Sequence, residues 1–343
     1  MDLNVLWFLL LGVLLAGYAI LDGFDFGFGI LAPLARTDRE RRIVINSIGP
    51  LWDGNEVWLV TFGGAMFAAF PELYATVFSG FYIAFMLLLF ALILRAVSLE
   101  FRSKLPPAAW RGFWDSGFFL ASLLAPILFG VAVGSVMVGV PVDARGIYAG
   151  GFLDILFPAR VPFYPVLVGL LTASLFTMHG AIYLYLKTED ELQGRVRRWM
   201  WHGFGTFLVL YLLTTIVTLA TIPHAMENFS RFPWAWIVVL LSVLAIGNIP
   251  RAIFNEAPGQ AFLSSSVLIA MLIGLVGIAL YPNVLVSSTG DADNLTIYNA
   301  ASSPKTLGIM AVIAALGMPF VLAYTGVIYW TFRGKVRIGE HSY

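Results

Sequence analysis

The sequence predicts an all-α polytopic membrane protein with nine transmembrane helices. Of its 343 residues, 59% are hydrophobic and only 12% are charged, which is about half the charged share of an average soluble domain. Long uncharged runs recur along the whole chain, whereas the strands of a membrane barrel would alternate apolar and polar residues. These observations exclude a soluble enzyme, a nucleic-acid binder and a disordered chain. They favour a single integral membrane domain over residues 1–343.

The nine apolar runs are each long enough to cross a hydrocarbon core, which takes about 20 residues. The first run is preceded by Met1-Asp2-Leu3-Asn4 and lacks the basic start of a cleavable signal peptide, so we expect it to be a genuine span. Each run is dense in Leu, Ile, Val, Phe and Ala. In chain order, the expected spans cover residues 3–31, 45–70, 73–98, 114–139, 161–186, 202–222, 233–250, 260–282 and 305–332.

The distribution of basic residues gives the expected orientation. With nine spans, 16 of the 20 Lys and Arg residues fall on one face of the membrane and 4 on the other. Cytoplasmic segments carry the excess of Lys and Arg in membrane proteins. We therefore expect the N-terminus outside and the C-terminus in the cytoplasm, with loops too short to fold as separate domains.

Four acidic residues lie within the first two expected spans. Asp22 and Asp25 are spaced i, i+3, as are Asp53 and Glu56, so the members of each pair share a helix face. A rise of about 1.5 Å per residue puts Asp22 near the cytoplasmic boundary, with Asp53 and Glu56 roughly 12 and 16 Å deep. Because acids inside a span are costly and usually functional, we interpret the four as a proton relay from the cytoplasm. Purely structural ion pairing is the alternative.

Other polar residues near these acids are candidate supports. Trp52 and Asn55 flank Asp53 in the second span, and Arg95 closes the third. Arg95 would either extend its charged head to the cytoplasmic interface or pair with one of the acids. His179 lies well inside a span, where we expect a neutral ring bonded to a neighbour rather than a haem ligand. With no cysteine and four histidines, we expect no metal site in this chain.

Three stretches of the first third resemble a known family. They read LDGFDFGFGIL at residues 21–31, NSIGPLWDGNEVWL at 46–59, and a run from Phe78 to Arg95 followed by FRSK at 101–104. In this order they are similar to subunit II of cytochrome bd-type quinol oxidases. The rest of the chain agrees in length and in number of spans.

This resemblance implies two four-helix bundles plus one peripheral helix in the plasma (inner) membrane of a bacterium. The complex would oxidise quinol and reduce dioxygen to water, generating a proton gradient without pumping. Its heterodimeric partner, subunit I, would carry haem b and a second haem of b or d type. This chain would ligate none, although it can hold a structural quinone, and small accessory subunits can join the complex.

For the proton path, the resemblance points to Asp22, Asp25 and especially Asp53. The family often has a neutral residue where Glu56 stands. Two functions of other classes stay open: a cation-coupled secondary transporter using the same acids, and a non-catalytic membrane scaffold. A transporter usually has broken helices in both halves, whereas only the second expected span is interrupted, by Pro50 and Gly54.

Overall fold

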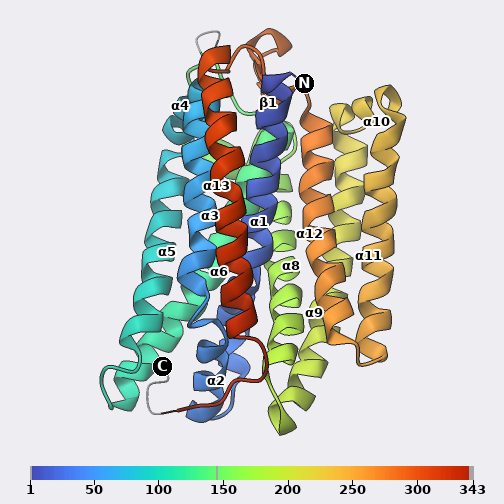
Figure 1. Ribbon diagram of the computed structural model, residues 1–343. Helices are drawn as coiled ribbons and strands as arrows, with labels where there is room; N and C mark the ends of the chain where they lie inside the picture. The colour runs from blue at the N-terminus through green and yellow to red at the C-terminus, as the bar shows by residue number, and fades with distance from the viewer. Residues whose placement is uncertain (1, 144–145, 340–343) are drawn as a thin grey trace.

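The computed structural model describes residues 2–143 and 146–339, which form long helices running side by side with short segments at both ends (Figure 1). The first helices are α1 (Leu3–Leu31), η1 (Ala32–Leu34), α2 (Asp38–Ile48), α3 (Trp52–Ala69), α4 (Pro71–Gly80), α5 (Tyr82–Phe101), α6 (Ala108–Val138) and α7 (Phe152–Leu156). The later helices are α8 (Tyr164–Lys187), α9 (Asp190–Thr221), η2 (Pro223–Ala225), α10 (Glu227–Arg231), η3 (Pro233–Ala235), α11 (Trp236–Phe254), α12 (Pro258–Leu280), η4 (Asp291–Asp293) and α13 (Pro304–Thr331). Two short strands, β1 (Asn283–Leu285) and β2 (Leu295–Thr296), pair antiparallel.

Eight helices of the described residues are long and apolar enough to cross a membrane. They overlap eight of the nine expected spans, and the predicted all-helical fold is confirmed. The eight segments are Leu3–Leu34, Tyr82–Phe101, Ala108–Val138, Tyr164–Lys187, Asp190–Thr221, Pro233–Phe254, Pro258–Leu280 and Pro304–Thr331. The second expected span corresponds to α3, whose 18 residues include the polar run Asp53 to Glu56. The count of nine spans stays a prediction.

Two of the expected spans are not continuous helices. The run 45–70 is divided, because α2 ends at Ile48 and α3 begins at Trp52. Pro50 lies in this break, and a proline disfavours helical backbone at the residue before it. The run 73–98 is divided between α4 and α5 at Phe81. Helix α9 is longer than expected, since its polar start at Asp190 continues directly into the apolar run.

Helix α1 occupies the centre of the molecule and packs against α3, α6, α8 and α12. Glycines allow its close approach to α8: a Cβ built on Gly27 would lie 2.1 Å from the Phe176 carbonyl oxygen, and one on Gly180 would lie 2.7 Å from the Gly27 Cα. Backbones can approach this closely only where both helices carry small residues. This contact joins the first helices of the chain to the later ones.

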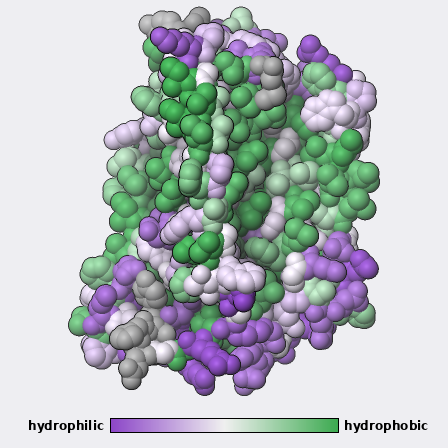
Figure 2. Space-filling model, viewed as in Figure 1, coloured by the Kyte–Doolittle hydropathy of each residue, from purple (hydrophilic) through white to green (hydrophobic). Residues whose placement is uncertain are grey.

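Helix α13 lies on the outside, in front of α1 and α3 in Figure 1, and most of its side chains are exposed. Helix α1 begins at one end of the helical bundle, and α13 ends at the opposite end. Figure 2 shows mostly apolar side chains along the flank of the molecule, with hydrophilic ones gathered toward the ends. An apolar band between two polar ends is the surface that a bilayer requires.

Candidate functional site

Arg95 of α5 is the centre of a buried ion-pair cluster. Its guanidinium contacts both carboxylate oxygens of Asp22 on α1, with Nη1–Oδ1 at 2.8 Å and Nη2–Oδ2 at 3.0 Å. Nη2 also binds Oε1 of Glu56 on α3. The Phe26 ring completes the site, with its centroid 4.1 Å from the guanidinium carbon. Arg95 is therefore an ion-pair partner rather than a residue whose head extends to the interface.

The cluster is held by three helices that the sequence brings together from distant positions. The side chains of Asp22 and Arg95 are 0% and 1% exposed, so neither charge has water as a partner. The longer Glu56 side chain keeps 25% of its surface exposed and links the cluster to the outside of α3. Removing one partner of such a buried pair would leave an uncompensated charge, which is strongly destabilising. The two charges are therefore buried together.

Asp25, one turn beyond Asp22 on α1, has a neutral partner instead. Asn55 Nδ2 donates to Asp25 Oδ2 at 2.8 Å and to the Leu21 carbonyl oxygen at 3.1 Å. The hydroxyl group of Tyr329 on α13 donates a hydrogen bond to Asn55 Oδ1 at 2.9 Å. Within the described residues, Asp25 Oδ1 has no hydrogen-bond partner. Asp25 is thus a buried carboxyl group that accepts a hydrogen bond from an amide and interacts with the neighbouring Asp22 carboxyl group.

Asp53 does not join the other three acids. It lies exposed in the first turn of α3, while Trp52, which begins the helix, is half-buried against the apolar residues around Phe24. The short Asp53 side chain shares a helix face with Glu56, but only the longer Glu56 reaches Arg95. In place of the expected row of four acids, Asp22 and Asp25 are buried, Glu56 is partly exposed and bound to Arg95, and Asp53 lies on the surface beside them.

His179 of α8 is fully buried and uses both ring nitrogens. Nδ1 lies 2.7 Å from Ser265 Oγ on α12, and Nε2 lies 3.0 Å from the Ile20 carbonyl oxygen on α1. The ring stacks on Phe262 with a centroid distance of 5.0 Å. These contacts tie three helices together, so the residue does not fit a haem ligand. Among the described residues, no group of three His, Cys, Asp or Glu side chains could hold a metal ion.

A second ion-pair network lies where α5 ends, near α2. Arg102 donates from Nε to Asp115 Oδ1 at 2.5 Å and from Nη2 to Asp38 Oδ1 at 2.8 Å. Arg41 adds a contact to Asp115 at 3.3 Å, and Arg111 adds one to Asp38 at 3.2 Å. Partial burial alone would raise the pKa of Asp38. The hydrogen bond and charge of Arg102, with the nearby arginines, outweigh it and lower that pKa below its usual value.

Sequence reasoning gave no sign of this second network. Asp115 lies inside α6, two turns after the helix begins at Ala108, and pairs with Arg102 rather than capping the helix. Tyr329 was also missed, because a tyrosine near the end of a span is usual in the aromatic belts of membrane proteins. Only the fold brings it next to Asn55, which lies far away in the sequence.

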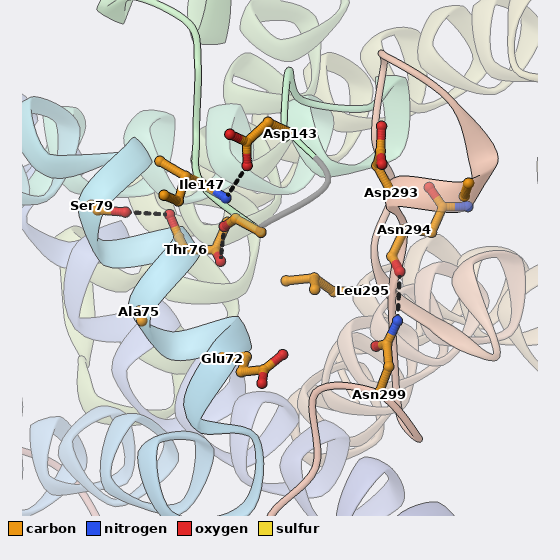
Figure 3. A pocket seen from close by; sticks show the side chains of 12 residues that line it. Glu72, Ala75, Thr76, Ser79, Asp143, Ile147, Asp293, Asn294, Leu295 and Asn299 are labelled. Atoms are coloured by element: carbon orange, nitrogen blue, oxygen red, sulfur yellow. Dashed lines mark hydrogen bonds between the residues drawn. The ribbon is translucent and has the colours of Figure 1, made fainter.

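A pocket of about 650 Å³ opens at the other end of the bundle, between α4 and the segments around Asp143 and β2 (Figure 3). Glu72, Asp143 and Asp293 are among the residues that line it. Asp143 Oδ1 accepts the Ile147 N–H at 3.0 Å, and Asp293 Oδ2 accepts the Thr289 hydroxyl at 2.9 Å. Two of these acids therefore support loop structure. The pocket shares no residue with the Arg95 cluster.

The apolar helices and the buried cluster together define a polytopic membrane protein with ionisable groups held between its helices. Residues 3–332 match the family described as cytochrome bd terminal oxidase subunit II. The chain therefore belongs to this family.

This chain is similar in sequence to individual relatives over nearly its whole length. It is 37% identical to cytochrome bd-I ubiquinol oxidase subunit 2 of Escherichia coli K12, covering 97% of this chain and 95% of that protein. It is 35% identical to cytochrome bd ubiquinol oxidase subunit 2 of Bacillus subtilis, covering 98% and 97%. The fold matches the structure of bd oxidase from Geobacillus thermodenitrificans with a TM-score of 0.78 at 19% identity, covering 97% and 99%.

Family membership confirms the function that the sequence motifs predicted. The chain is a subunit of a cytochrome bd quinol oxidase, an oxidoreductase complex with haem cofactors and a partner subunit I. The hypothesis of a cation-coupled transporter is wrong, because the matching family is an oxidase. The roles of the individual acids stay predictions.

Proposed function

We propose that this subunit supports the haem-bearing subunit I and conducts protons to it from the cytoplasmic face. Reduction of dioxygen to water consumes protons. If these protons come from the cytoplasm while quinol protons leave outside, charge is separated without a pump. The observation that carries the proposal is the cluster in which Arg95 pairs with Asp22 and Glu56 while a third carboxyl group, that of Asp25, lies buried beside them.

The charge balance of the cluster supports proton exchange. Asp22, Asp25 and Glu56 would together carry three negative charges, against the single positive charge of Arg95. An uncompensated charge is costly where water is excluded, so the resting cluster keeps at least one proton on a carboxyl group. Asp25 has no guanidinium contact among the described ion pairs, and its Oδ1 has no hydrogen-bond partner among the described residues. We assign the exchangeable proton to Asp25.

The outer face of α3 supports a route out of the cluster. Glu56 is partly exposed and interacts electrostatically with Asp53 on this face. Nearby side chains are small or apolar: a Cβ on Gly54 or Gly64 would meet nothing within 4 Å, and Val60 is 73% exposed. Small residues suit close helix packing in a membrane. In this proposal subunit I docks on this face, and Asp53 delivers protons at the interface.

The membrane arrangement belongs to the same proposal. Helices α1, α3, α5 and α6 form one four-helix bundle, α8, α9, α11 and α12 form the second, and α13 is peripheral. This grouping is supported by the contacts of α1 with α3 and α6 and of α5 with α6 in the first bundle, and by those of α8 with α9 and of α11 with α12 in the second. All nine helices span the inner membrane of a bacterium, with the N-terminus outside and the C-terminus in the cytoplasm, as the basic residues predict.

The cofactors of the complex lie in subunit I in this proposal: haem b, a second haem of b or d type, and the quinol-oxidation site. The engaged ring of His179 supports a chain that ligates no haem. A structural quinone can bind the apolar surface of this subunit, and one or more small accessory subunits can join the complex.

The test is Asp25→Asn in the complex assembled with its native partner. We expect quinol-driven oxygen consumption to fall by about 100-fold, the lower range for loss of a proton-transferring side chain, and the membrane potential to build up more slowly. Asp53→Asn should also slow both. Glu72→Gln is the matched control, because Glu72 is an exposed acid at the opposite end of the bundle.

The haem content of each variant shows whether the complex has assembled. The proposal is contradicted if the Asp25→Asn complex has normal haem content, full turnover and a normal membrane potential. This subunit would then be a non-catalytic scaffold. The same result for Asp53→Asn alone would remove Asp53 from the path and leave the buried cluster in it.

A further inference from the structure

The peripheral helix α13 is fixed at the end where it begins. Trp7 Nε1 of α1 donates to the Leu307 carbonyl oxygen at 3.0 Å. Just before the helix, Ser302 Oγ donates to the Ala68 carbonyl oxygen of α3 at 2.7 Å. Between its ends α13 is mostly exposed, with Phe320 78% exposed. The helix is therefore anchored by polar contacts near its start rather than by burial along its length.

The end of α13 is fixed by the segment that follows it, residues 332–336, which we term the C-terminal strap. Lys187 Nζ donates to the Phe332 carbonyl oxygen at 2.5 Å, and the Val336 N–H donates to the Lys187 carbonyl oxygen at 2.9 Å. Lys335 Nζ donates to the Thr188 carbonyl oxygen at 2.5 Å. The last carbonyl groups of a helix lack partners within it and attract cations. The strap therefore binds the end of α8.

We propose that Tyr329 is a positioning residue for Asp25, with α13 and the C-terminal strap holding its hydroxyl group against Asn55. This inference rests on the proposed function of Asp25 as the proton-exchanging group. Tyr329 transfers no proton itself, since the Asn55 amide stands between the two side chains.

The hydrogen bonds of Asn55 give the physical basis. Its Nδ2 hydrogens are donated to Leu21 and Asp25, and its Oδ1 accepts from Tyr329. A proton donor at the amide oxygen polarises the amide and strengthens the hydrogen bonds that its N–H groups donate. Those bonds favour the ionised form of Asp25. Tyr329 thus aids proton release from Asp25 through Asn55.

Aromatic belts at the membrane interface are the simpler explanation for a tyrosine near the end of a span. A belt tyrosine directs its hydroxyl group to water or lipid headgroups. The Tyr329 hydroxyl group is instead bound to Asn55, which is only 2% exposed. Its ring is edge-on to Phe24 of α1 at a centroid distance of 6.5 Å. Tyr324, on the same helix, is 63% exposed and represents the ordinary lipid-facing case.

Titratable groups face Asp25 from several helices. They are Asp22 on its own helix, Arg95 on α5, Tyr183 on α8 and Tyr329 on α13. Tyr329→Phe leaves all the other groups and the ring contact with Phe24 in place. This substitution therefore isolates the hydroxyl group.

The experiment compares Tyr329→Phe with Tyr324→Phe in the assembled complex. We expect Tyr329→Phe to keep its haem content, to lose about two- to tenfold in turnover, as the loss of one hydrogen bond would give, and to move the rising limb of the pH profile to higher pH. In infrared difference spectra, the carboxyl band that Asp25→Asn removes should shift in Tyr329→Phe and stay unchanged in Tyr324→Phe.

Lys335→Met gives a second variant that leaves the cluster untouched. It removes the contacts of the Lys335 side chain with the end of α8, which weakens the hold of the strap, and should shift the same band in the same direction. Identical pH profiles and band positions in Tyr329→Phe and Tyr324→Phe, with turnover lost in Asp25→Asn, would overturn the positioning role and leave the proton path intact. Full turnover in Asp25→Asn would instead overturn the proton path itself.

Discussion

Arg95 and Arg102 lie two helical turns apart along the same stretch of chain, and each is buried and bound to two carboxylates, yet their surroundings differ. Around Arg95, Asp22 is 0% exposed and no second arginine contacts the described carboxylates of the cluster. Around Arg102, Asp38 is 45% exposed, and Arg41 and Arg111 also bind its carboxylate partners.

The difference between the two sites is one of charge balance. The network around Arg102 has three guanidinium groups for two carboxylates among the described ion pairs, and these pairs fasten α2 to α5 and α6. The cluster around Arg95 has one guanidinium for three carboxyl groups, Asp25 included. Burial of an arginine is common to both sites, whereas an excess of acidic groups distinguishes the site around Arg95, to which we assign proton transfer.

The largest expected effect comes from removing the two arginines in turn. Arg95→Met leaves Asp22 buried without a cation and should cost about 3–5 kcal/mol, as breaking a buried pair does. Arg102→Met should cost less, because Asp38 and Asp115 reach water and keep other arginines. The yield of haem-loaded complex from membranes measures both. If the two variants lose the same yield of haem-loaded complex, the difference in charge balance between the two sites has no effect on stability.

A smaller effect on assembly is expected for Glu56→Gln. The amide oxygen still accepts from Arg95, and the cluster loses one of its excess negative charges, so stability should change by about 1 kcal/mol or less. Turnover should fall about two- to tenfold if Glu56 passes protons toward Asp53, since a glutamine carries none. Oxygen consumption per haem measures this turnover. An unchanged rate in a normally assembled complex would show that Glu56 is not part of the proton path.

The smallest effect is a pH-dependent one at the second network. The pKa of Asp38 is lowered in the folded protein, so its ion pairs stabilise the fold above the ordinary aspartate pKa of about 3.9. That contribution disappears as the pH falls through the lowered pKa. At pH 7 the Tm of Asp38→Asn should therefore be lower by about 2 °C, because exposed pairs contribute up to about 1 kcal/mol.

Repeating the Tm measurement at decreasing pH tests whether the stabilising contribution of Asp38 is lost on acidification. The gap between the natural protein and Asp38→Asn should close on acidification below about pH 4. A gap that widens on acidification would mean that Asp38 is not held in its ionised form by the arginines.

Much of the fold follows from hydropathy alone, because a span must be a continuous run of apolar residues. The break before α3 was predictable from Pro50, which lies between α2 and α3. The division at Phe81 could not be predicted, because α4 and α5 are both apolar and no proline or charge separates them. Local sequence does not encode a break made by packing.

The candidate site was predictable only in part. Spacing put Asp53 and Glu56 on one helix face, but it could not show that only the longer side chain spans the distance to Arg95. The pairing of Arg95 with Asp22 depends on how α5 packs against α1, which neither helix specifies by itself. Asn55 and Tyr329 meet across most of the chain, so their contact exists only in the folded molecule.

The anchoring of α13 at both ends also bears on the order in which the protein is made. Helices enter the membrane as they leave the ribosome, and α13 follows every other long helix of the described chain. Asn55 therefore lacks its tyrosine partner until this last helix has inserted and the C-terminal strap has bound α8. A synthesis intermediate without α13 would contain the buried acids with an incomplete hydrogen-bond shell, so the hydrogen bonds around Asn55 are completed only when the bundle is complete.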